Sequence, residues 1–218
     1  MPVGPNGTSI ILPASWISEA DMISLSDADL SWDEKPADAH FIVASRLVRE
    51  KGIPLLIDAL MNLEGKGETI SVDVMGSGAM KADLEGIAGK LRNVRLRLLD
   101  PVPYGPSFMR ALRQYHAVIV PVTGDEQARI LYDAFSQAIP IIAANTAGNR
   151  EVVTHGGTGF LFEADNPAAL SETLCHCADD LDGLRQAGLS ALTVAAKHTH
   201  ADMHGKRAEF LRETFGEC

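Results

Sequence analysis

Residues 41–52 read FIVASRLVREKG, and this stretch decides the fold class of the chain. Its first four residues are all apolar, which is typical of a β-strand buried on both faces of a sheet. A short polar segment follows, and residues 53–63 then place four leucines and an alanine on one stripe at helical spacing. We therefore expect a buried strand, a loop and an amphipathic helix, which together begin a βαβ unit.

The same alternation of strand and helix patterns continues to the end of the chain. Further strands are predicted for the apolar runs at 70–74, 94–98, 117–120, 141–144 and 160–162. Further helices are predicted at 79–91, 106–114, 127–138, 167–178, 180–196 and 202–215. The first two of those runs alternate polar and apolar residues, so we expect them nearer an edge. The pattern predicts an α/β, Rossmann-like fold, in which a doubly wound parallel sheet carries helices on both faces.

The N-terminal segment, residues 1–38, has no clear periodicity and is rich in Pro, Gly, Ser and Asp. Trp16 and Trp32 stand in it as isolated aromatic residues. We interpret this segment as a linker or edge segment. One domain is then expected at 39–218, with a C-terminal helix at 199–218.

Composition and charge restrict the class of function. The chain has 218 residues, of which 46% are hydrophobic and 22% charged, as in ordinary globular proteins. The 29 acidic and 19 basic residues give a net charge of −10, which argues against a nucleic-acid-binding surface. The three cysteines do not suggest a disulfide framework, and no signal peptide is visible. No apolar run approaches the ~20 residues that a membrane span needs, so we predict a cytoplasmic protein.

Candidate functional residues follow the predicted strands, because ligands of open α/β sheets bind beyond the C-terminal strand ends. Arg46 and Lys51 lie between the first strand and its helix, where two cations can bind an anion. On spacing alone, solvated surface cations are a slightly better interpretation. After the second strand, Gly76 and Gly78 permit close approach of either a ligand or another backbone segment. A G-x-G without a third glycine is a weak nucleotide motif.

Acidic and small residues follow the fourth and fifth strands. Asp125 lies near the start of the helix predicted at 127–138, where a carboxylate can cap the first turn. Asp133 lies roughly two turns later, so both carboxylates are expected on nearly the same face. There they could hydrogen-bond sugar hydroxyls, or act merely as a cap and a surface acid. Gly148 and Asn149 belong to a loop that could meet a phosphate or a sugar, or simply connect two elements.

No metal site is expected. His200 and His204 are four residues apart and share a helix face, but a third ligand is missing. Cys175 and Cys177 are too closely spaced for the usual zinc pairings, and a helix would turn their thiols apart.

Taken together, these segments resemble the C-terminal domain of group 1 retaining GT-B glycosyltransferases. Residues 41–52 are similar to the family's strand followed by G-R-L-x-x-E-K-G, and residues 74–78 to its V-x-G-x-G turn. Residues 133–143 resemble E-A-x-A-x-G-x-P-V-V-A, and residues 148–162 contain segments similar to G-x-x-E-V-V and N-G-x-L-V. The blocks come in the family's order and spacing.

The resemblance implies that the chain is the donor half of a hexosyltransferase-like enzyme that binds a nucleotide-diphosphate sugar, with no metal or other cofactor. Arg46 and Lys51 would hold the diphosphate and, with Asp125, would be the catalytic residues. Asp125 would face the sugar as the first acid of the E-x7-E motif, and Asp133 would hold the ribose as the second. The donor-binding positions that it implies are Arg46, Lys51, Gly76, Gly78, Asp125, Glu126, Asp133, Gly148 and Asn149.

The acidic motif departs from the family pattern. Both acids are Asp, one methylene shorter than Glu, and Glu126 and Ala128 stand where glycines are usual. Glu126 therefore brings a negative charge near the expected diphosphate. A degenerate, non-catalytic GT-B interaction module is the first alternative function, and a GT-B sugar-nucleotide epimerase is the second.

GT-B enzymes hold the acceptor in an N-terminal domain, and residues 1–38 are too few to supply one. We therefore expect the acceptor domain of the same enzyme as a partner, and no nucleic acid. The chain by itself is expected to be incomplete for catalysis. Peripheral association with the inner face of the membrane would come through the missing half.

Overall fold

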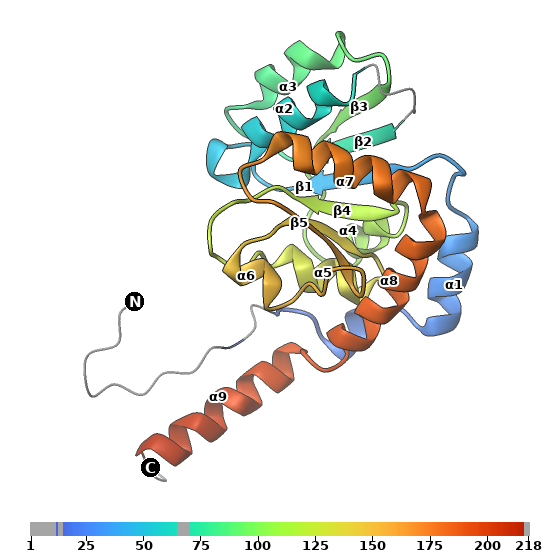
Figure 1. Cartoon of the computed structure of the whole chain (residues 1–218). Coiled ribbons are helices and arrows are strands. Elements are labelled where there is room, and N and C mark those ends of the chain that lie inside the picture. Colours follow the sequence, from blue (N-terminus) through green and yellow to red (C-terminus); the bar gives the residue numbers. More distant parts are fainter. Residues whose placement is uncertain (1–11, 13–14, 65–69, 216–218) are drawn as a thin grey trace.

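A six-stranded parallel sheet forms the centre of the computed structural model, which describes residue 12 and residues 15–64 and 70–215. The strand order is β3-β2-β1-β4-β5-β6 (Figure 1). The strands are β1 (His40–Ala44), β2 (Ile70–Met75), β3 (Val94–Leu99), β4 (Ala117–Val120), β5 (Ile141–Ala144) and β6 (Gly159–Phe162). All six predicted strands are confirmed. The chain winds outward from β1 to one edge and from β4 to the other, so the direction of winding reverses between these two strands.

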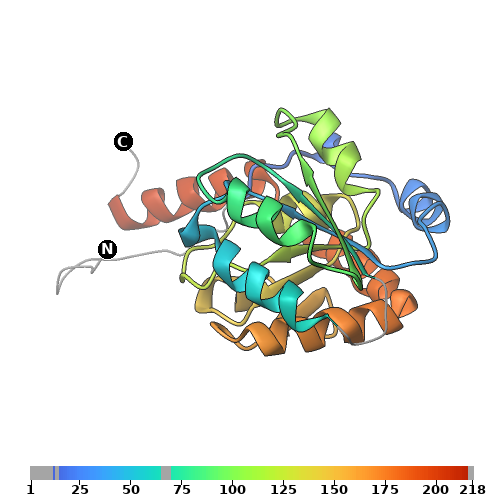
Figure 2. The ribbon, with the colours of Figure 1, turned by 90° about the horizontal axis from the view of Figure 1, so that it is seen from above.

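Helices cover both faces of the sheet, as Figure 2 shows in an edge-on view, and the doubly wound prediction is therefore confirmed. One face packs against α2 (Ile53–Asn62), α3 (Lys81–Ala88) and α7 (Pro167–Asp179). The other face packs against α4 (Pro106–Leu112) and α5 (Ile130–Ser136). The remaining helical elements are η1 (Glu19–Asp21), α1 (Leu25–Asp33), η2 (Arg49–Lys51), α6 (Ala147–Arg150), α8 (Leu181–Ala195) and α9 (His200–Phe215).

Residues of β1 enter the two sides of the core in alternation. Phe41 and Val43 pack with the residues of α2 and α7, whereas Ile42 packs with those of α4 and α5. Burial on both faces explains why residues 41–44 of this strand are all apolar. Strand β3 lies at the edge, where Arg95 and Arg97 alternate with apolar residues, as the sequence pattern predicted.

Helix α1 and the residues around it pack against the rest of the domain. Of the two interpretations of residues 1–38, the linker is therefore wrong for the described part of the segment, and the edge segment is not contradicted. Trp32 is buried, and its indole Nε1 donates a hydrogen bond of 3.1 Å to the carbonyl oxygen of Ala138. Arg185 of α8 pairs with Asp29 at 3.0 Å and with Asp33 at 2.7 Å. The helix is thereby attached to both the loop after α5 and helix α8.

The amphipathic pattern of α1 is hidden because its two leucines face solvent. Leu25 and Leu30 are 62% and 61% exposed, while Ala28 and Trp32 are buried. Apolar residues therefore surround the helix rather than forming one stripe, and periodicity does not reveal it. Ser24, whose side chain accepts a hydrogen bond from the Asp27 amide, is the clearest local signal of the helix start.

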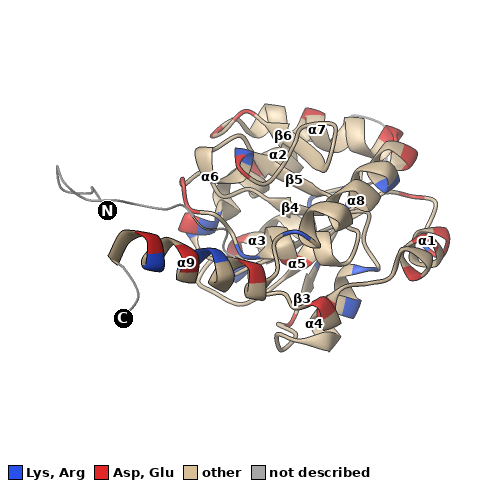
Figure 3. Cartoon of the chain, turned by 90° about the horizontal axis from the view of Figure 1, so that it is seen from below, with Lys and Arg blue, Asp and Glu red and all other residues tan. Residues whose placement is uncertain are grey.

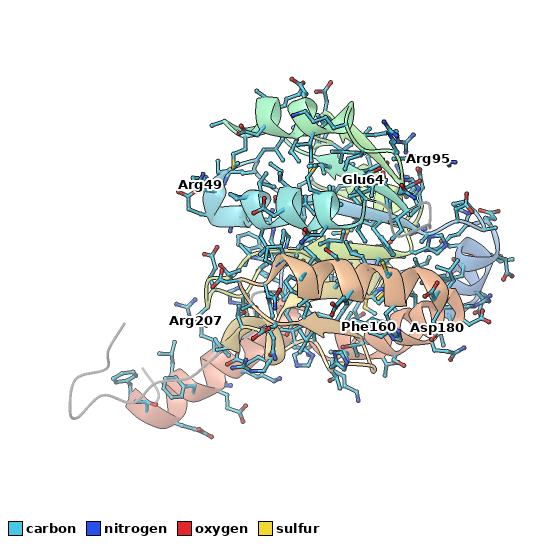
Figure 4. The ribbon with its side chains drawn as sticks, turned by 45° about the horizontal axis from the view of Figure 1, so that its top comes forward. Arg49, Glu64, Arg95, Phe160, Asp180 and Arg207 are labelled. Carbon is cyan, nitrogen blue, oxygen red and sulfur yellow. The ribbon has the colours of Figure 1, made fainter. Side chains whose placement is uncertain are left out.

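The C-terminal helices differ in how they contact the domain. Asp180, labelled in Figure 4, ends α7 and caps α8 by accepting a hydrogen bond of 2.8 Å from the Gly183 amide. Helix α9 has no buried residue and extends away from the sheet (Figure 1). Its acidic and basic residues are interspersed along the helix (Figure 3), as in a solvated surface helix. No helix in the described part of the chain has the length and apolar composition of a membrane span.

The packing of α1 predicts unequal roles for the two tryptophans. Replacing Trp32 with alanine should lower the free energy of unfolding by about 3–5 kcal/mol, since it removes a buried aromatic ring and a hydrogen bond. Trp16→Ala is the matched control, because Trp16 is 60% exposed, and it should lower that free energy by about 1 kcal/mol or less. Urea unfolding of the two variants measures both values. Equal effects would mean that α1 does not stabilise the domain.

Candidate functional site

A cavity of about 430 Å³ opens at the C-terminal ends of β1, β2 and β4. It lies where the winding of the sheet reverses, which is the usual ligand position in open α/β folds. Three cations line it, together with two acids and an apolar wall. These are Arg46, Lys51, Arg129, Glu126, Asp133, Val43, Val102, Tyr104, Phe108 and Val122, among others. Of the donor-binding positions expected from the sequence, five line the cavity: Arg46, Lys51, Gly76, Glu126 and Asp133.

Arg46 and Lys51 are brought to the cavity by the loop between β1 and α2. Gly52 ends this loop with a φ of 74°, and a Cβ atom there would lie 2.0 Å from the carbonyl oxygen of Pro121. Glycine is therefore required for the loop to pack against the chain after β4. Arg49, labelled in Figure 4, lies on η2 at the same end of the sheet but is not among the cavity-lining residues. Within the described chain, Arg46 and Lys51 are thus the cations of this loop that face the cavity.

Gly76 and Gly78 permit close contact between two backbone segments. A Cβ atom on Gly76 would lie 1.9 Å from the carbonyl oxygen of Ser45, and one on Gly78 would lie 2.3 Å from that of Leu47. The Leu47 amide also donates a hydrogen bond of 2.9 Å to the carbonyl oxygen of Ser77. The turn after β2 is therefore joined to the loop that carries Arg46. Of the two roles considered for these glycines, the structure demonstrates approach to another backbone segment.

Asp125 does not lie on the same helix as Asp133, which corrects the expectation of two carboxylates on one helical face. Helix α5 begins at Ile130, later than predicted, so Asp125 belongs to the preceding loop and does not cap α5. Its side chain is exposed, is not among the cavity-lining residues, and accepts a long hydrogen bond of 3.4 Å from the Ala147 amide. Helical spacing fails here because the chain between the two acids is irregular over its first half.

Gly148 and Asn149 lie outside the cavity lining, Gly148 against the loop of Asp125 and Asn149 against the end of β5. A Cβ atom on Gly148 would lie 2.6 Å from the carbonyl oxygen of Asp125. The side-chain amide of Asn149 is buried and donates a hydrogen bond of 2.8 Å to the carbonyl oxygen of Ala144. In this structure both residues contact other parts of the chain. This agrees with the interpretation of the loop as a connection between two elements.

Asp133 lies at the floor of the cavity and is 2% exposed. The Tyr104 hydroxyl donates a hydrogen bond of 2.9 Å to its Oδ1. Burial raises the pKa of the Asp133 carboxyl to about 6, although the bond from Tyr104 and the charge of Arg129 lower it. The Arg129 guanidinium carbon lies 4.5 Å from the centre of the Tyr104 ring. Sequence reasoning identified neither Tyr104 nor Arg129 as a site residue.

Glu126 pairs with Lys51 across the cavity mouth. The Lys51 Nζ and Glu126 Oε1 atoms are 2.5 Å apart, and the two side chains are 25% and 65% exposed. The hydrogen bond from Lys51, its charge and the charge of Arg46 hold the pKa of the Glu126 carboxyl below its usual value. The negative charge that the sequence placed near the expected anion site is therefore in direct contact with one of its cations.

In the described part of the chain, no three His, Cys, Asp or Glu residues are grouped so that they could hold a metal ion. His200 and His204 lie one turn apart on α9, with their Nε2 atoms 3.0 Å apart, as expected for residues on one helix face. Cys177 is buried, and burial raises the pKa of its thiol to about 12. Metal-independent function stays a prediction.

The sheet order and the position of the cavity define a Rossmann-like α/β domain with a ligand site at the reversal of winding. The chain belongs to the family of glycosyl transferases group 1, whose sequence model matches residues 28–181. The match begins within helix α1, in agreement with the packing of that helix in the domain.

Solved glycosyltransferase structures share this fold. Sucrose-phosphate synthase from Thermosynechococcus elongatus matches with a TM-score of 0.73 at 18% identity, over 92% of this chain and 51% of that one. HepE from Anabaena, solved in complex with UDP, matches with a TM-score of 0.68 at 23% identity, over 92% and 54%. A D-inositol 3-phosphate glycosyltransferase from Paenarthrobacter aurescens is 22% identical over 190 residues, which are 84% of this chain and 45% of that protein. The chain therefore spans about half the length of these proteins.

The contact between Gly52 and Pro121 predicts a strong effect of one methyl group. Gly52→Ala should lower the free energy of unfolding by about 1–2 kcal/mol through its left-handed backbone, and by about 1–3 kcal/mol more through the collision. Gly156→Ala is the matched control, because Gly156 has a φ of 72° and open space around its Cβ position. Urea unfolding separates the two contributions. Equal losses in both variants would contradict the close contact.

The buried carboxyl of Asp133 predicts a dependence of stability on pH. Its pKa is raised to about 6 in the folded state, so the folded protein binds more protons than the unfolded chain between about pH 4 and pH 6. The stabilisation from this group is complete at low pH and is lost as the pH rises through 6. Asp133→Asn should therefore gain stability relative to the unsubstituted chain, by about 2–3 kcal/mol, between pH 4 and pH 7. Urea unfolding at several pH values tests this, and a constant difference would contradict it.

Proposed function

We propose that this chain is the donor-binding half of a glycosyltransferase that takes a nucleotide-diphosphate sugar and transfers the sugar with retention of configuration. The observation that carries the proposal is one cavity at the reversal of the sheet, lined by Arg46 and Lys51 and floored by the Asp133 carboxylate. Cations and a buried hydrogen-bond acceptor in one cavity suit a ligand that has both phosphates and hydroxyls.

The lining suggests how a donor would lie in the cavity. The diphosphate would lie near Arg46 and Lys51, where charge-assisted hydrogen bonds are strongest. The ribose would lie over Asp133, whose carboxylate can accept hydrogen bonds from two hydroxyls. The apolar side chains of Val102, Tyr104 and Phe108 would then face the base. In this arrangement the diphosphate end of the ligand contacts cations, and the base end contacts apolar side chains.

In the proposed reaction, the two cations Arg46 and Lys51 have the main role. When the bond between the anomeric carbon and the diphosphate breaks, negative charge develops on the departing oxygen, and Arg46 and Lys51 are placed to stabilise it. The acceptor hydroxyl oxygen forms the new bond to the anomeric carbon, and its proton passes to the departing diphosphate oxygen. We propose that no metal takes part. Asp125 lies outside the cavity lining, so its proposed contact with the sugar requires its loop to move.

Support for a uridine nucleotide comes from the structural neighbours. The HepE structures contain UDP or UDP-glucose, and a TarM structure contains UDP. These are properties of those proteins, and we propose UDP-sugars as the first donors to test. We further propose that the rest of the protein supplies the acceptor domain. On this proposal the whole protein works in the cytoplasm or at the inner face of the membrane.

A non-catalytic interaction module is the second candidate function. The position of Asp125 outside the cavity and the pairing of Lys51 with Glu126 favour it. Replacing Asp125 and Asp133 together in the full-length protein distinguishes the candidates. Loss of function in the cell supports the enzyme, whereas intact function supports the interaction module.

Donor binding is predicted to depend on Arg46 and not on Arg49. Arg46→Ala should weaken UDP binding by about 10–100-fold, because one charge-assisted hydrogen bond to a phosphate contributes about 1.5–3 kcal/mol. Arg49→Ala removes the same charge from the same loop at a residue outside the cavity lining, and should change the affinity by about threefold or less. Isothermal titration calorimetry measures both.

Two results would contradict the proposal. The first is no detectable binding of UDP, GDP or ADP, or of their sugars, to the unsubstituted chain. The second is an equal loss of affinity in the Arg46 and Arg49 variants, which would indicate a general effect of charge rather than a site.

A further inference from the structure

The anion nearest the cavity cations belongs to the chain itself. Glu126 comes from the loop after β4, and its Oε1 atom lies 2.5 Å from the Nζ atom of Lys51, which is 75 positions earlier in the sequence. Arg46 also acts on this carboxylate, because its charge contributes to the lowered pKa of Glu126. Glu126 therefore occupies a position where Arg46 and Lys51 both attract negative charge.

The pair reduces the positive charge that a ligand meets. Arg46, Lys51 and Arg129 line the cavity, and Arg129 lies over the Tyr104 ring. With Lys51 held by Glu126, the cavity cations that are exposed and without an acidic partner at salt-bridge distance within the described chain are Arg46 and Arg129. A diphosphate that engages Lys51 as well must either share the ammonium group with the Glu126 carboxylate or displace that carboxylate.

The position of Glu126 makes displacement feasible. Its side chain is 65% exposed, and it lies on an irregular loop between β4 and α5 rather than on a strand or helix. Ion pairs this exposed are weak, because water screens both charges and the side chains lose freedom on pairing. A phosphate group carries more charge than a carboxylate and can engage Lys51 and Arg46 together.

We propose that Glu126 competes with the donor diphosphate for Lys51. The Glu126 carboxylate pairs with Lys51 and must leave it when the nucleotide binds there. This inference rests on the proposed function, because it concerns the same anion site. Glu126 sets the affinity of the site for anions. A weakly charged anion does not displace its carboxylate from Lys51, whereas a ligand with two phosphates does. A neutral side chain at this position makes the site bind nucleoside diphosphates more tightly.

Calorimetric titration of UDP into the unsubstituted chain and the Glu126→Gln variant tests the proposal. The variant should bind UDP about tenfold more tightly, which corresponds to about 1.4 kcal/mol, and the gain should shrink as salt concentration rises. Glu50→Gln is the matched control. Glu50 is also exposed, adjoins Lys51 in the sequence and is not among the cavity-lining residues. Its loss should change the affinity by about threefold or less.

A double-mutant cycle separates competition for Lys51 from a general effect of charge. In a Lys51→Ala background, Glu126→Gln should improve UDP binding by much less than tenfold, because no lysine is left to release. Unfolding of Glu126→Gln by urea checks that the fold is unchanged, as expected for an exposed pair.

The possible results lead to different conclusions. Tighter binding of UDP by Glu126→Gln, and not by Glu50→Gln, supports the competitor. Equal or weaker binding by Glu126→Gln, with the unsubstituted chain binding UDP, overturns the competitor and leaves the proposed function intact. If neither the unsubstituted chain nor Glu126→Gln binds UDP, GDP or ADP, the proposed function fails and the inference fails with it.

Discussion

Close backbone contact among the loops after β1, β2 and β4 is the constraint on which the cavity depends. The backbone at Gly52 packs against the carbonyl group of Pro121, and the backbone at Gly76 packs against that of Ser45. A Cβ atom at either glycine would overlap a carbonyl oxygen, so the loops reach this separation only with hydrogen as the side chain. Because Lys51 immediately precedes Gly52, the same contact brings its ammonium group beside the β4 loop and Glu126.

Two of the charged groups that line the cavity, Lys51 and Asp133, are paired with other side chains of the chain. Lys51 contacts Glu126, and Asp133 accepts a hydrogen bond from the Tyr104 hydroxyl. A carboxylate and a phenol hydroxyl have the hydrogen-bonding chemistry of a phosphate and a ribose hydroxyl, respectively. Such pairing lowers the penalty of burying Asp133 without a ligand, and it also means that a ligand exchanges contacts rather than simply adding them.

The fold accommodates departures from the family pattern that local rules would disfavour. Ala138 stands where the related pattern has glycine and adopts a φ of 57°, a left-handed conformation that disfavours a Cβ atom. Its carbonyl oxygen accepts the hydrogen bond from Trp32 and packs against Gly188. His116 is a buried polar residue, and its Nδ1 accepts a hydrogen bond of 3.0 Å from the His40 amide. Neighbouring elements thus hold both residues in place.

Periodicity was sufficient for the six strands and the two covered faces, because these follow from which residues a parallel sheet buries. The rule that ligands bind beyond the strand ends made Arg46 and Lys51 candidates, although spacing alone favoured solvated surface cations. The cavity-lining position of Asp133 agrees with the family resemblance rather than with the expected helical face. Periodicity did not predict α1, because the leucines of that helix face solvent. It also misplaced Asp125, because spacing could not reveal that α5 begins at Ile130. Periodicity also could not predict the contacts of Glu126 and Tyr104. Each joins residues far apart in the chain, and such contacts exist only once the loops have packed against one another.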